Sequence, residues 1–260
     1  MDGGEDVSNK IKILFLAANP VDAKSRLRLD EEFKHIRMKL RGGERRDCFE
    51  LVSEWAVTVE DLQEILLCHR PHILHFSGHG SETDGITLED QSGKMRQLNQ
   101  QAFANLIKVL KDNLRIVVLN ACYSEDQANY LKEIVDFTIG MGKAVGDKAA
   151  IVFASHFYQG LAFGRSVATA FELGKGQLDL STIPESDTPK LLVRYGVAAT
   201  DVIIQSASAK NGSGPKDPNN ADERSGSNSI HNIGSNVGVE IAKAGAVDLQ
   251  HSTFKFGGRD

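Results

Sequence analysis

His72–Gly80 reads HILHFSGHG, and Arg115–Ser124 reads RIVVLNACYS. Each stretch is a short apolar run that ends in small residues and one reactive side chain, His79 in the first and Cys122 in the second. Short apolar runs of this kind predict buried strands of a parallel sheet, whose chemistry collects beyond the carboxyl ends of the strands. If the two strands are neighbours, an imidazole and a thiol lie side by side, which is the arrangement that nucleophilic catalysis by cysteine requires.

The chain around these two runs alternates between strand and helix patterns. The predicted strands are Ile11–Ala18, Phe49–Trp55, Ile73–Phe76, Ile116–Leu119, Phe137–Met141 and an edge strand at Leu191–Tyr195. The predicted helices are Leu29–Leu40, one that follows Thr58, Ala102–Leu110, one from Ser124 to about Val135, Lys148–Phe157 and Gly164–Leu173. Ile86–Glu89 and Met95–Leu98 flank a Gly-containing turn and predict a β-hairpin inserted beside the main sheet. This order predicts an α/β fold with a mostly parallel sheet and helices on both faces.

The composition is that of an ordinary soluble protein. Of 260 residues, 25% are charged and 41% hydrophobic, and the formal net charge of −5 argues against a nucleic-acid-binding surface over the whole molecule. The chain has three cysteines, which are far apart in sequence: Cys48, Cys68 and Cys122. Their small, odd number and wide spacing fit a reducing cytoplasm better than a disulfide framework. The first residues, MDGGEDVSNK, lack a signal-peptide pattern, and no run reaches the roughly 18 apolar residues of a membrane helix. We therefore expect a cytoplasmic protein that contacts neither a membrane nor nucleic acid directly.

No motif predicts a metal or another cofactor. His69, His72, His75 and His79 are close in sequence, but alternate strand residues point to opposite faces and no cysteine pairs with them. His75, within the apolar run, fits a core histidine. The first strand is followed by AANPVD, and no Gly-rich phosphate loop is present, so nucleotide binding is a weak alternative.

The pattern divides the chain into four parts. Residues 1–9 form a polar N-terminal tail, and residues 10–205 form the α/β domain. Residues 206–236 are rich in Ser, Asn, Gly and Lys and predict a disordered linker. Residues 237–260 return to weak apolar alternation, which is too short for a core of its own. This segment fits a strand pair that docks on the same protein or on a partner, and it fits equally a segment that is disordered until a partner arrives. The C-terminal part is therefore predicted to be a flexible tail.

The small residues beside His79 and Cys122 have a role in this hypothesis. Gly78 and Gly80 let the backbone approach a substrate, and the N–H groups of Gly80 and Cys122 are the candidates for an oxyanion hole. In the alternative interpretation these residues have structural roles only: the glycines form a turn, and Cys122 is a small, unreactive core side chain. No Asp or Asn is placed clearly enough to be a third catalytic member, and a backbone carbonyl could orient His79 instead.

Two blocks carry a family resemblance: HFSGHG at His75–Gly80 and VVLNAC at Val117–Cys122. Both resemble the motifs of CHAT-domain proteases in the caspase/separase clan, and Asp136–Leu173 is similar to the later half of such domains. The resemblance covers about residues 10–180. It implies a caspase-like fold and a cysteine endopeptidase, with His79 as general base and acid and Cys122 as the nucleophile.

The resemblance also implies partners. The family acts in bacterial signalling and antiviral defence, commonly beside sensor or repeat modules, and the sequence before residue 10 contains no such module. We therefore expect a specific partner protein as substrate and a regulatory or sensor protein that acts as the trigger through residues 206–260. The alternative is a non-catalytic interaction module that keeps the fold and uses the tail for assembly.

Substrate-binding residues are harder to predict. In caspase-like folds the loop after the fifth strand helps to form the S1 pocket, and here that loop is Met141–Asp147. Asp147 could receive a basic side chain, although its position before an apolar helix also predicts a helix N-cap. Asp136 is a second acidic candidate, and Tyr123 follows the nucleophile closely enough to line the cleft.

Overall fold

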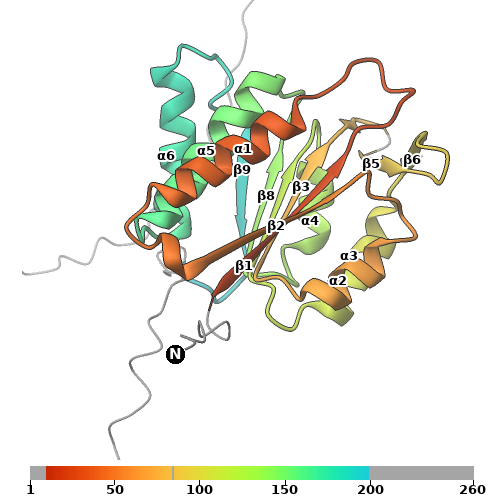
Figure 1. Ribbon diagram of the computed structural model, residues 1–260, viewed down its shortest axis with the longest axis horizontal. Coiled ribbons are helices and arrows are strands. Elements are labelled where there is room, and N and C mark those ends of the chain that lie inside the picture. The colour runs from red at the N-terminus through yellow and green to blue at the C-terminus, as the bar shows by residue number, and fades with distance from the viewer. Residues whose placement is uncertain (1–9, 84, 199–260) are drawn as a thin grey trace, which may run out of the picture. The chain divides into compact units, whose positions relative to one another are not determined.

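The fold is centred on a six-stranded sheet, as the computed structural model shows for residues 10–83 and 85–198 (Figure 1). In spatial order its strands are β2 (Phe49–Trp55), β1 (Ile11–Ala18), β3 (Ile73–Gly78), β7 (Ile116–Asn120), β8 (Phe137–Met141) and β9 (Pro189–Val193). The first five are parallel, and β9 pairs antiparallel with β8 at the edge. The helices are α1 (Leu29–Arg41), α2 (Leu62–His69), α3 (Gln100–Leu110), α4 (Glu125–Leu131), α5 (Asp147–Ala162) and α6 (Val167–Leu180), with a short 3-10 turn at Arg46–Cys48.

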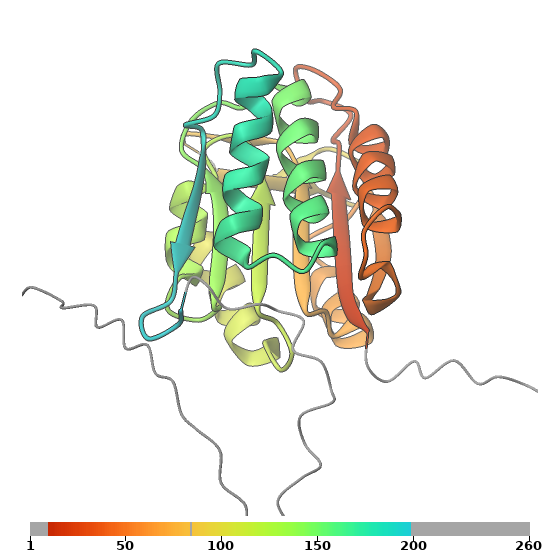
Figure 2. The same ribbon diagram turned by 90° about the vertical axis from the view of Figure 1, so that its left-hand side faces the viewer.

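Two hydrophobic clusters cover the two faces of this sheet. One cluster joins the strands to α1, α5 and α6, which Figure 2 shows together on one face, and the other joins them to α2, α3 and α4. Residues of β3, β7 and β8 are buried throughout, because both of their faces are covered. This is why these strands are continuous apolar runs and do not alternate between apolar and polar residues.

The predicted hairpin is present beside the carboxyl ends of the strands. β5 (Gly85–Glu89) pairs antiparallel with β6 (Met95–Gln97), and β5 also pairs with a short strand, β4 (Gly80–Ser81), which directly follows His79. The chain therefore passes from β3 through His79 into the hairpin sheet, and the pairing of β4 with β5 fixes the position of the segment after His79.

The α/β fold, its mostly parallel sheet, the helices on both faces and the hairpin are confirmed, while several boundaries differ from the prediction. The helix from Ser124 ends at Leu131 rather than near Val135, and the helix after Thr58 begins only at Leu62. Helix α6 begins at Val167, after Gly164 takes a positive φ of 71° and Ser166 caps the new helix. The predicted linker, C-terminal segment and N-terminal tail lie outside the described residues.

Candidate active site

The sheet brings His79 and Cys122 to one edge. Strands β3 and β7 are parallel neighbours, and Ser77 on β3 is paired with Asn120 on β7. His79 and Cys122 each follow two residues later, at the carboxyl ends of these strands. A side-chain methyl group on Gly80 would overlap the carbonyl oxygen of Cys122, so the two backbones touch here and glycine is required. The predicted juxtaposition of the two strand ends is therefore observed.

The His79 ring is oriented by a neighbour on the other side. Its Nε2 lies 3.3 Å from the Oδ1 of Asn19, the first residue after β1. If Nε2 carries the proton and donates to this oxygen, Nδ1 carries no proton and can accept one. His79 is half-buried, and burial lowers its pKa below the ordinary value for histidine. The ring is therefore neutral, and able to accept a proton, at pH 7.

Asn19 is the site residue that the sequence analysis missed. Its amide is itself held in place, because Nδ2 donates to the Leu27 carbonyl at 3.0 Å and Oδ1 accepts from the Leu27 N–H at 3.3 Å. In the sequence Asn19 marks only the end of the first strand. The signal that could have found it is its position: β1 is the other neighbour of β3, so the residue after β1 must lie beside His79.

The thiol of Cys122 contacts a loop rather than the imidazole. Its Sγ donates to the carbonyl of Val145 at 3.6 Å and accepts from the Val145 N–H at 3.4 Å. Among the described residues no hydrogen bond joins Cys122 to His79. The two side chains therefore occupy the same edge, but each is bound to a different segment, the thiol to the loop after β8 and the imidazole to the loop after β1.

The two candidate oxyanion donors are available. Among the described residues the Cys122 N–H has no acceptor. Gly80 on β4 is paired with Ile86 on β5. The N–H of Thr87 donates to the carbonyl of His79, so the pair of Gly80 and Ile86 is one whose members do not hydrogen-bond each other in the antiparallel ladder. The N–H of Gly80 consequently points away from β5. Both groups are free to donate to a developing negative charge.

A buried polar cluster lies directly beneath the site and consists of Glu32, His75, Ser77, Asn120 and Tyr158. The Glu32 carboxylate accepts from Ser77 Oγ at 2.5 Å, from Asn120 Nδ2 at 2.6 Å and from His75 Nε2 at 2.8 Å. His75 Nδ1 contacts the Tyr158 hydroxyl at 3.1 Å. Burial and the nearby Glu32 raise the pKa of Tyr158 well above its usual value, so this hydroxyl stays protonated and donates. His75 is thus a core histidine, and the cluster joins α1, β3, β7 and α5.

The three predicted substrate-binding residues are not brought together. Tyr123 lies at the site, where a positive φ of 55° forms the turn after Cys122. Asp147 lies on the same edge, but its carboxylate binds the backbone N–H and the guanidinium of Arg28. Gly146, not Asp147, occupies the N-cap position of α5. The hydroxyl of Ser124, near Tyr123, donates to the Leu119 carbonyl and accepts from the Met141 N–H.

Asp136 lies at the opposite edge of the sheet, before β8. Its carboxylate binds Arg115 Nε at 2.5 Å and Arg194 NH2 at 2.6 Å. Burial alone would raise the pKa of Asp136, but the hydrogen bonds and charges of the two arginines hold it below its usual value. This ion-pair triad ties β7, β8 and the end of β9 together, far along the strands from His79 and Cys122.

In residues 10–83 and 85–198, no group of three or more His, Cys, Asp or Glu side chains could hold a metal ion. No helix in the same residues has the length and apolar character that crossing a bilayer requires.

The family model described as "CHAT domain" matches residues 7–180, which is more than half of the chain. The chain belongs to the CHAT domain family. This confirms the resemblance carried by the two motif blocks, and the matched region contains both His79 and Cys122.

Curated relatives of this CHAT domain carry protease names. A "Probable protease" of Gillisia limnaea is 30% identical over 154 residues, which cover 58% of this chain and 27% of the relative. A "Roc-COR-CHAT protease" of an unknown prokaryotic organism is 28% identical over 166 residues, which cover 61% of this chain and 16% of the relative. The chain thus matches about a quarter or less of the length of these relatives.

Two solved structures are similar to part of this chain. The Arg-specific gingipain R (RgpB) has a TM-score of 0.48 and 12% sequence identity, covering 70% of this chain and 46% of the other. Caspase-1 from Spodoptera frugiperda has a TM-score of 0.47 and 10% identity, covering 70% of this chain and 85% of the other.

Proposed function

We propose that this CHAT domain is a cysteine endopeptidase that uses His79 and Cys122 to cleave a specific partner protein. The observation that carries the proposal is the meeting of the two strand ends, with Gly80 packed against the Cys122 backbone and the neutral ring of His79 held by Asn19. Membership of the CHAT family and the protease names of two relatives support it.

The chemistry proceeds by acyl transfer. The Nδ1 atom of His79 takes the thiol proton, and the Cys122 thiolate attacks the scissile carbonyl carbon. The oxyanion that forms accepts hydrogen bonds from the N–H groups of Gly80 and Cys122. When the C–N bond breaks, His79 returns its proton to the leaving amine. A water molecule, deprotonated by His79, then hydrolyses the thioester and releases the acid product and the thiol.

Activation by another chain is part of the proposal. In the structure the thiol is bonded to Val145, so a thiol–imidazole contact requires the loop at residues 142–146 to release Cys122. A partner that moves this loop would switch the enzyme on. We assign the contact with that partner to residues 206–260 and the biological role to bacterial signalling or antiviral defence. An activator is expected to raise the rate of cleavage without changing the sites of cleavage.

The test is cleavage of a peptide library, alone and with cell extract of the source organism. The library is a proteome digested with a glutamyl-specific protease, because such peptides keep internal Lys and Arg. The proteins compared are the unaltered chain, Cys122→Ala and, as a matched control, Cys68→Ala, which alters an exposed thiol away from the site. We expect new peptide ends from the unaltered chain and from Cys68→Ala, and none from Cys122→Ala.

The rival function is a non-catalytic interaction module, and one observation favours it: the thiol is bonded to a loop backbone rather than to a base. Identical peptides from all three proteins, with and without extract, would support this module and contradict the protease.

A further inference from the structure

The parallel sheet arranges three residues in a row along its carboxyl edge. Following the strand order from β7 through β3 to β1, the residues beyond the strand ends are Cys122, His79 and Asn19. Trp55 is the last residue of the next strand, β2, where it is paired with Ala17, two residues before Asn19. His79 therefore lies between the nucleophile and the ends of β1 and β2, and its hydrogen bond to Asn19 links it to the end of β1.

This row gives the substrate a direction, and the argument here rests on the proposed function. The acyl half of the substrate becomes attached to Cys122, whereas the amine half leaves after it receives a proton from His79. The leaving half must therefore run from the Cys122 sulfur past His79, toward Asn19 and Trp55. Side chains that follow the scissile bond meet the surface at the ends of β1 and β2.

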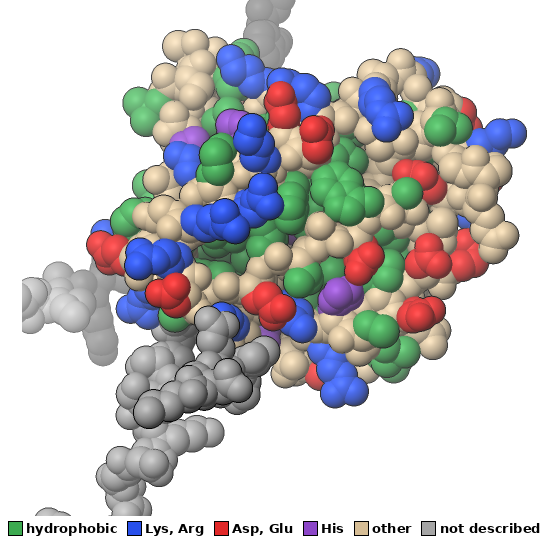
Figure 3. Space-filling view, in the orientation of Figure 1, with side chains coloured by type: hydrophobic (Ala, Val, Ile, Leu, Met, Phe, Trp, Pro, Cys, Tyr) green, Lys and Arg blue, Asp and Glu red, His purple; other side chains and the backbone are tan. Residues whose placement is uncertain are grey.

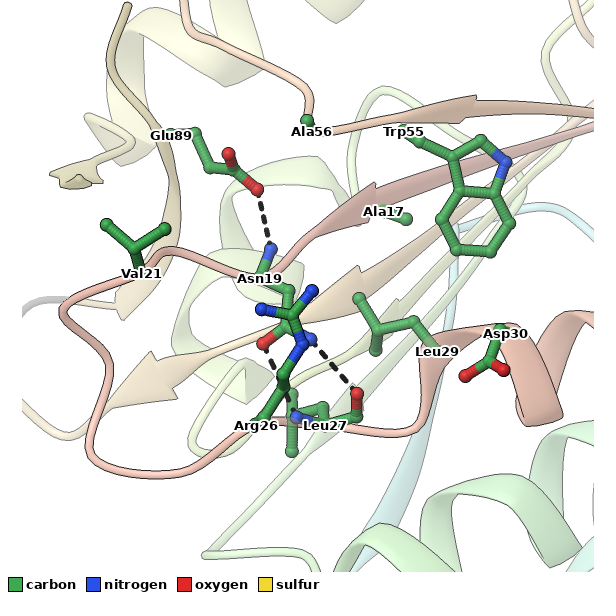
Figure 4. A pocket seen from close by; sticks show the side chains of 10 residues that line it. All are labelled: Ala17, Asn19, Val21, Arg26, Leu27, Leu29, Asp30, Trp55, Ala56 and Glu89. Atoms are coloured by element: carbon green, nitrogen blue, oxygen red, sulfur yellow. Dashed lines mark hydrogen bonds between the residues drawn. The ribbon is translucent and has the colours of Figure 1, made fainter. Parts of the chain in front are cut away.

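A pocket of about 540 Å³ lies at this place, and neither catalytic side chain lines it. Its lining includes Asn19, Arg26, Leu29, Asp30, Trp55 and Glu89 (Figure 4). We call it the leaving-side pocket. In the space-filling view, hydrophobic side chains gather beside α1, with acidic and basic side chains around them (Figure 3).

Hydrogen bonds between two loops build one wall of the pocket. The N–H of Asn19 donates to Glu89 Oε1 at 2.9 Å, and the N–H of Val21 donates to the Gly93 carbonyl at 2.9 Å. The N–H of Met95 donates to Asp22 Oδ1 at 2.7 Å. These bonds fasten the loop after β1 to the β5–β6 hairpin, so the pocket has a defined shape.

The lining favours a positively charged side chain with an apolar stem. The Trp55 side chain is 47% exposed, and its ring is held by contacts with Phe15 and Phe33 at centroid distances of 5.9 and 5.8 Å. An exposed indole face attracts a cation and offers apolar surface to its stem. The lining contains two carboxylates, those of Asp30 and Glu89, and one guanidinium, that of Arg26.

The charged groups of the pocket are spread along it. Figure 4 shows Asp30 and Trp55 on the right, Arg26 over Asn19 near the middle, and Glu89 on the left. Glu89 uses one carboxylate oxygen for the N–H of Asn19, while Asp30 is exposed to solvent. We propose that the leaving-side pocket binds a Lys or Arg side chain that follows the scissile bond, with its charged group between Asp30 and the Trp55 ring.

Binding can be measured without catalysis, because Trp55 is the single tryptophan of the chain. Full-length Cys122→Ala protein is titrated with Arg-Gly-Gly-amide and Gly-Arg-Gly-amide while the tryptophan fluorescence is recorded. Glu-Gly-Gly-amide and Ala-Gly-Gly-amide serve as controls. We expect a saturable change with at least one arginine peptide and a weaker or absent change with the controls.

Two variants locate the binding. Asp30→Asn in the Cys122→Ala background is expected to lower the affinity for the arginine peptide about fivefold, because an ion pair of about 1 kcal/mol is lost. Arg26→Gln removes the competing cation and is expected to tighten binding about twofold. The proposal is overturned if the arginine peptides cause no change, if the glutamate peptide binds more tightly, or if Asp30→Asn leaves the affinity unaltered.

The peptide-library digest separates this proposal from the proposed function. The protease and the pocket assignment are both supported if Cys122-dependent cleavage occurs preferentially before Lys or Arg and if Asp30→Asn abolishes this preference. Cys122-dependent cuts with no preference for a basic residue after the cut overturn the pocket assignment and leave the protease standing. Absence of any Cys122-dependent cut overturns the protease, and the assignment of the pocket to the leaving half falls with it.

Discussion

One pair of polar side chains lies on β3 and β7, a second pair lies just beyond the ends of these strands, and the two pairs are held in opposite ways. Ser77 and Asn120 are buried, and both donate to the same Glu32 carboxylate. His79 and Cys122, two residues further along, share no partner: the imidazole contacts Asn19 and the thiol contacts Val145. The lower pair is interlocked with the core, and the upper pair is positioned by two separate loops.

The difference shows how the fold separates stability from reactivity. The buried polar cluster fixes the ends of the strands, because removing any donor would leave the Glu32 carboxylate poorly paired in the core. The site above it gains its position from these strand ends but keeps its side chains free to change partners. Changes in the cluster are therefore expected to act on folding, and changes in the upper pair on catalysis.

The largest effects are expected from two histidines, His75 on β3 and His79 directly after this strand. His79→Ala should lower kcat/KM on a cleaved peptide by about 10²- to 10⁴-fold, the usual contribution of a general acid and base, with little change in stability. His75→Ala should lower the free energy of unfolding by about 3–5 kcal/mol, because a buried carboxylate loses its partner. Peptide kinetics and urea unfolding of both variants check this. Equal loss of stability in the two variants would contradict the separation.

Gly80 tests the contact between the two strand ends. In Gly80→Ala the added methyl group overlaps the Cys122 carbonyl, and the shift of the backbone should lower kcat/KM about 10²-fold while costing about 1–3 kcal/mol of stability. Gly176→Ala in helix α6 is the matched control, because nothing lies near its added methyl group. This control should be neutral or slightly stabilising. A fully active Gly80→Ala protein would show that the contact does not position Cys122.

The amino edge of the sheet offers a comparison with the carboxyl edge. Asp136→Asn removes the charge that binds Arg115 and Arg194, and it should lower the free energy of unfolding by about 1 kcal/mol. Peptide cleavage should keep its wild-type kcat/KM, since the triad lies at the other end of the strands. A selective loss of cleavage of basic peptides would instead restore Asp136 as a substrate-binding residue.

The smallest effect concerns pH. Burial lowers the pKa of His79, and burial also lowers the pKa of His72 and His156. The unfolded chain therefore binds protons at these three histidines more readily than the folded chain does. The free energy of unfolding is accordingly highest above the ordinary histidine pKa of about 6.5 and falls as the pH drops below it. Urea unfolding between pH 7 and pH 5 should show this decline, and His156→Gln should reduce its slope. An increase in stability on acidification would contradict the burial of these rings.

The sequence predicted the parts of the structure that local patterns encode. Strands β1, β2 and β8 have the predicted bounds, because each is a continuous or alternating apolar run between polar residues. The meeting of His79 and Cys122 was predictable for a general reason, since residues after neighbouring parallel strands share an edge.

The partners of polar side chains were not predictable in the same way. Glu32 and Asn120 are 88 residues apart in sequence, and nothing local to either residue indicates their hydrogen bond. Asp147 follows the pattern of a helix cap, yet Arg28, 119 residues away, binds its carboxylate. Asn19 follows the pattern of a strand end, and its contact with His79 depends on the order of strands in space.

The most direct test of the central claim compares two cysteines of the same chain. Iodoacetamide is added at neutral pH, and peptide mapping gives separate alkylation rates for the partly buried Cys122 and the exposed Cys68, in the unaltered chain and in His79→Ala. Because the resting thiol is bonded to Val145, the reaction is run with and without the cell extract that activates cleavage. With the extract, Cys122 is predicted to react faster than Cys68 despite its lower exposure, and His79→Ala is predicted to remove this advantage. A Cys122 that still reacts more slowly than Cys68 with the extract, at a rate that His79→Ala leaves unchanged, would contradict the pairing of these two residues.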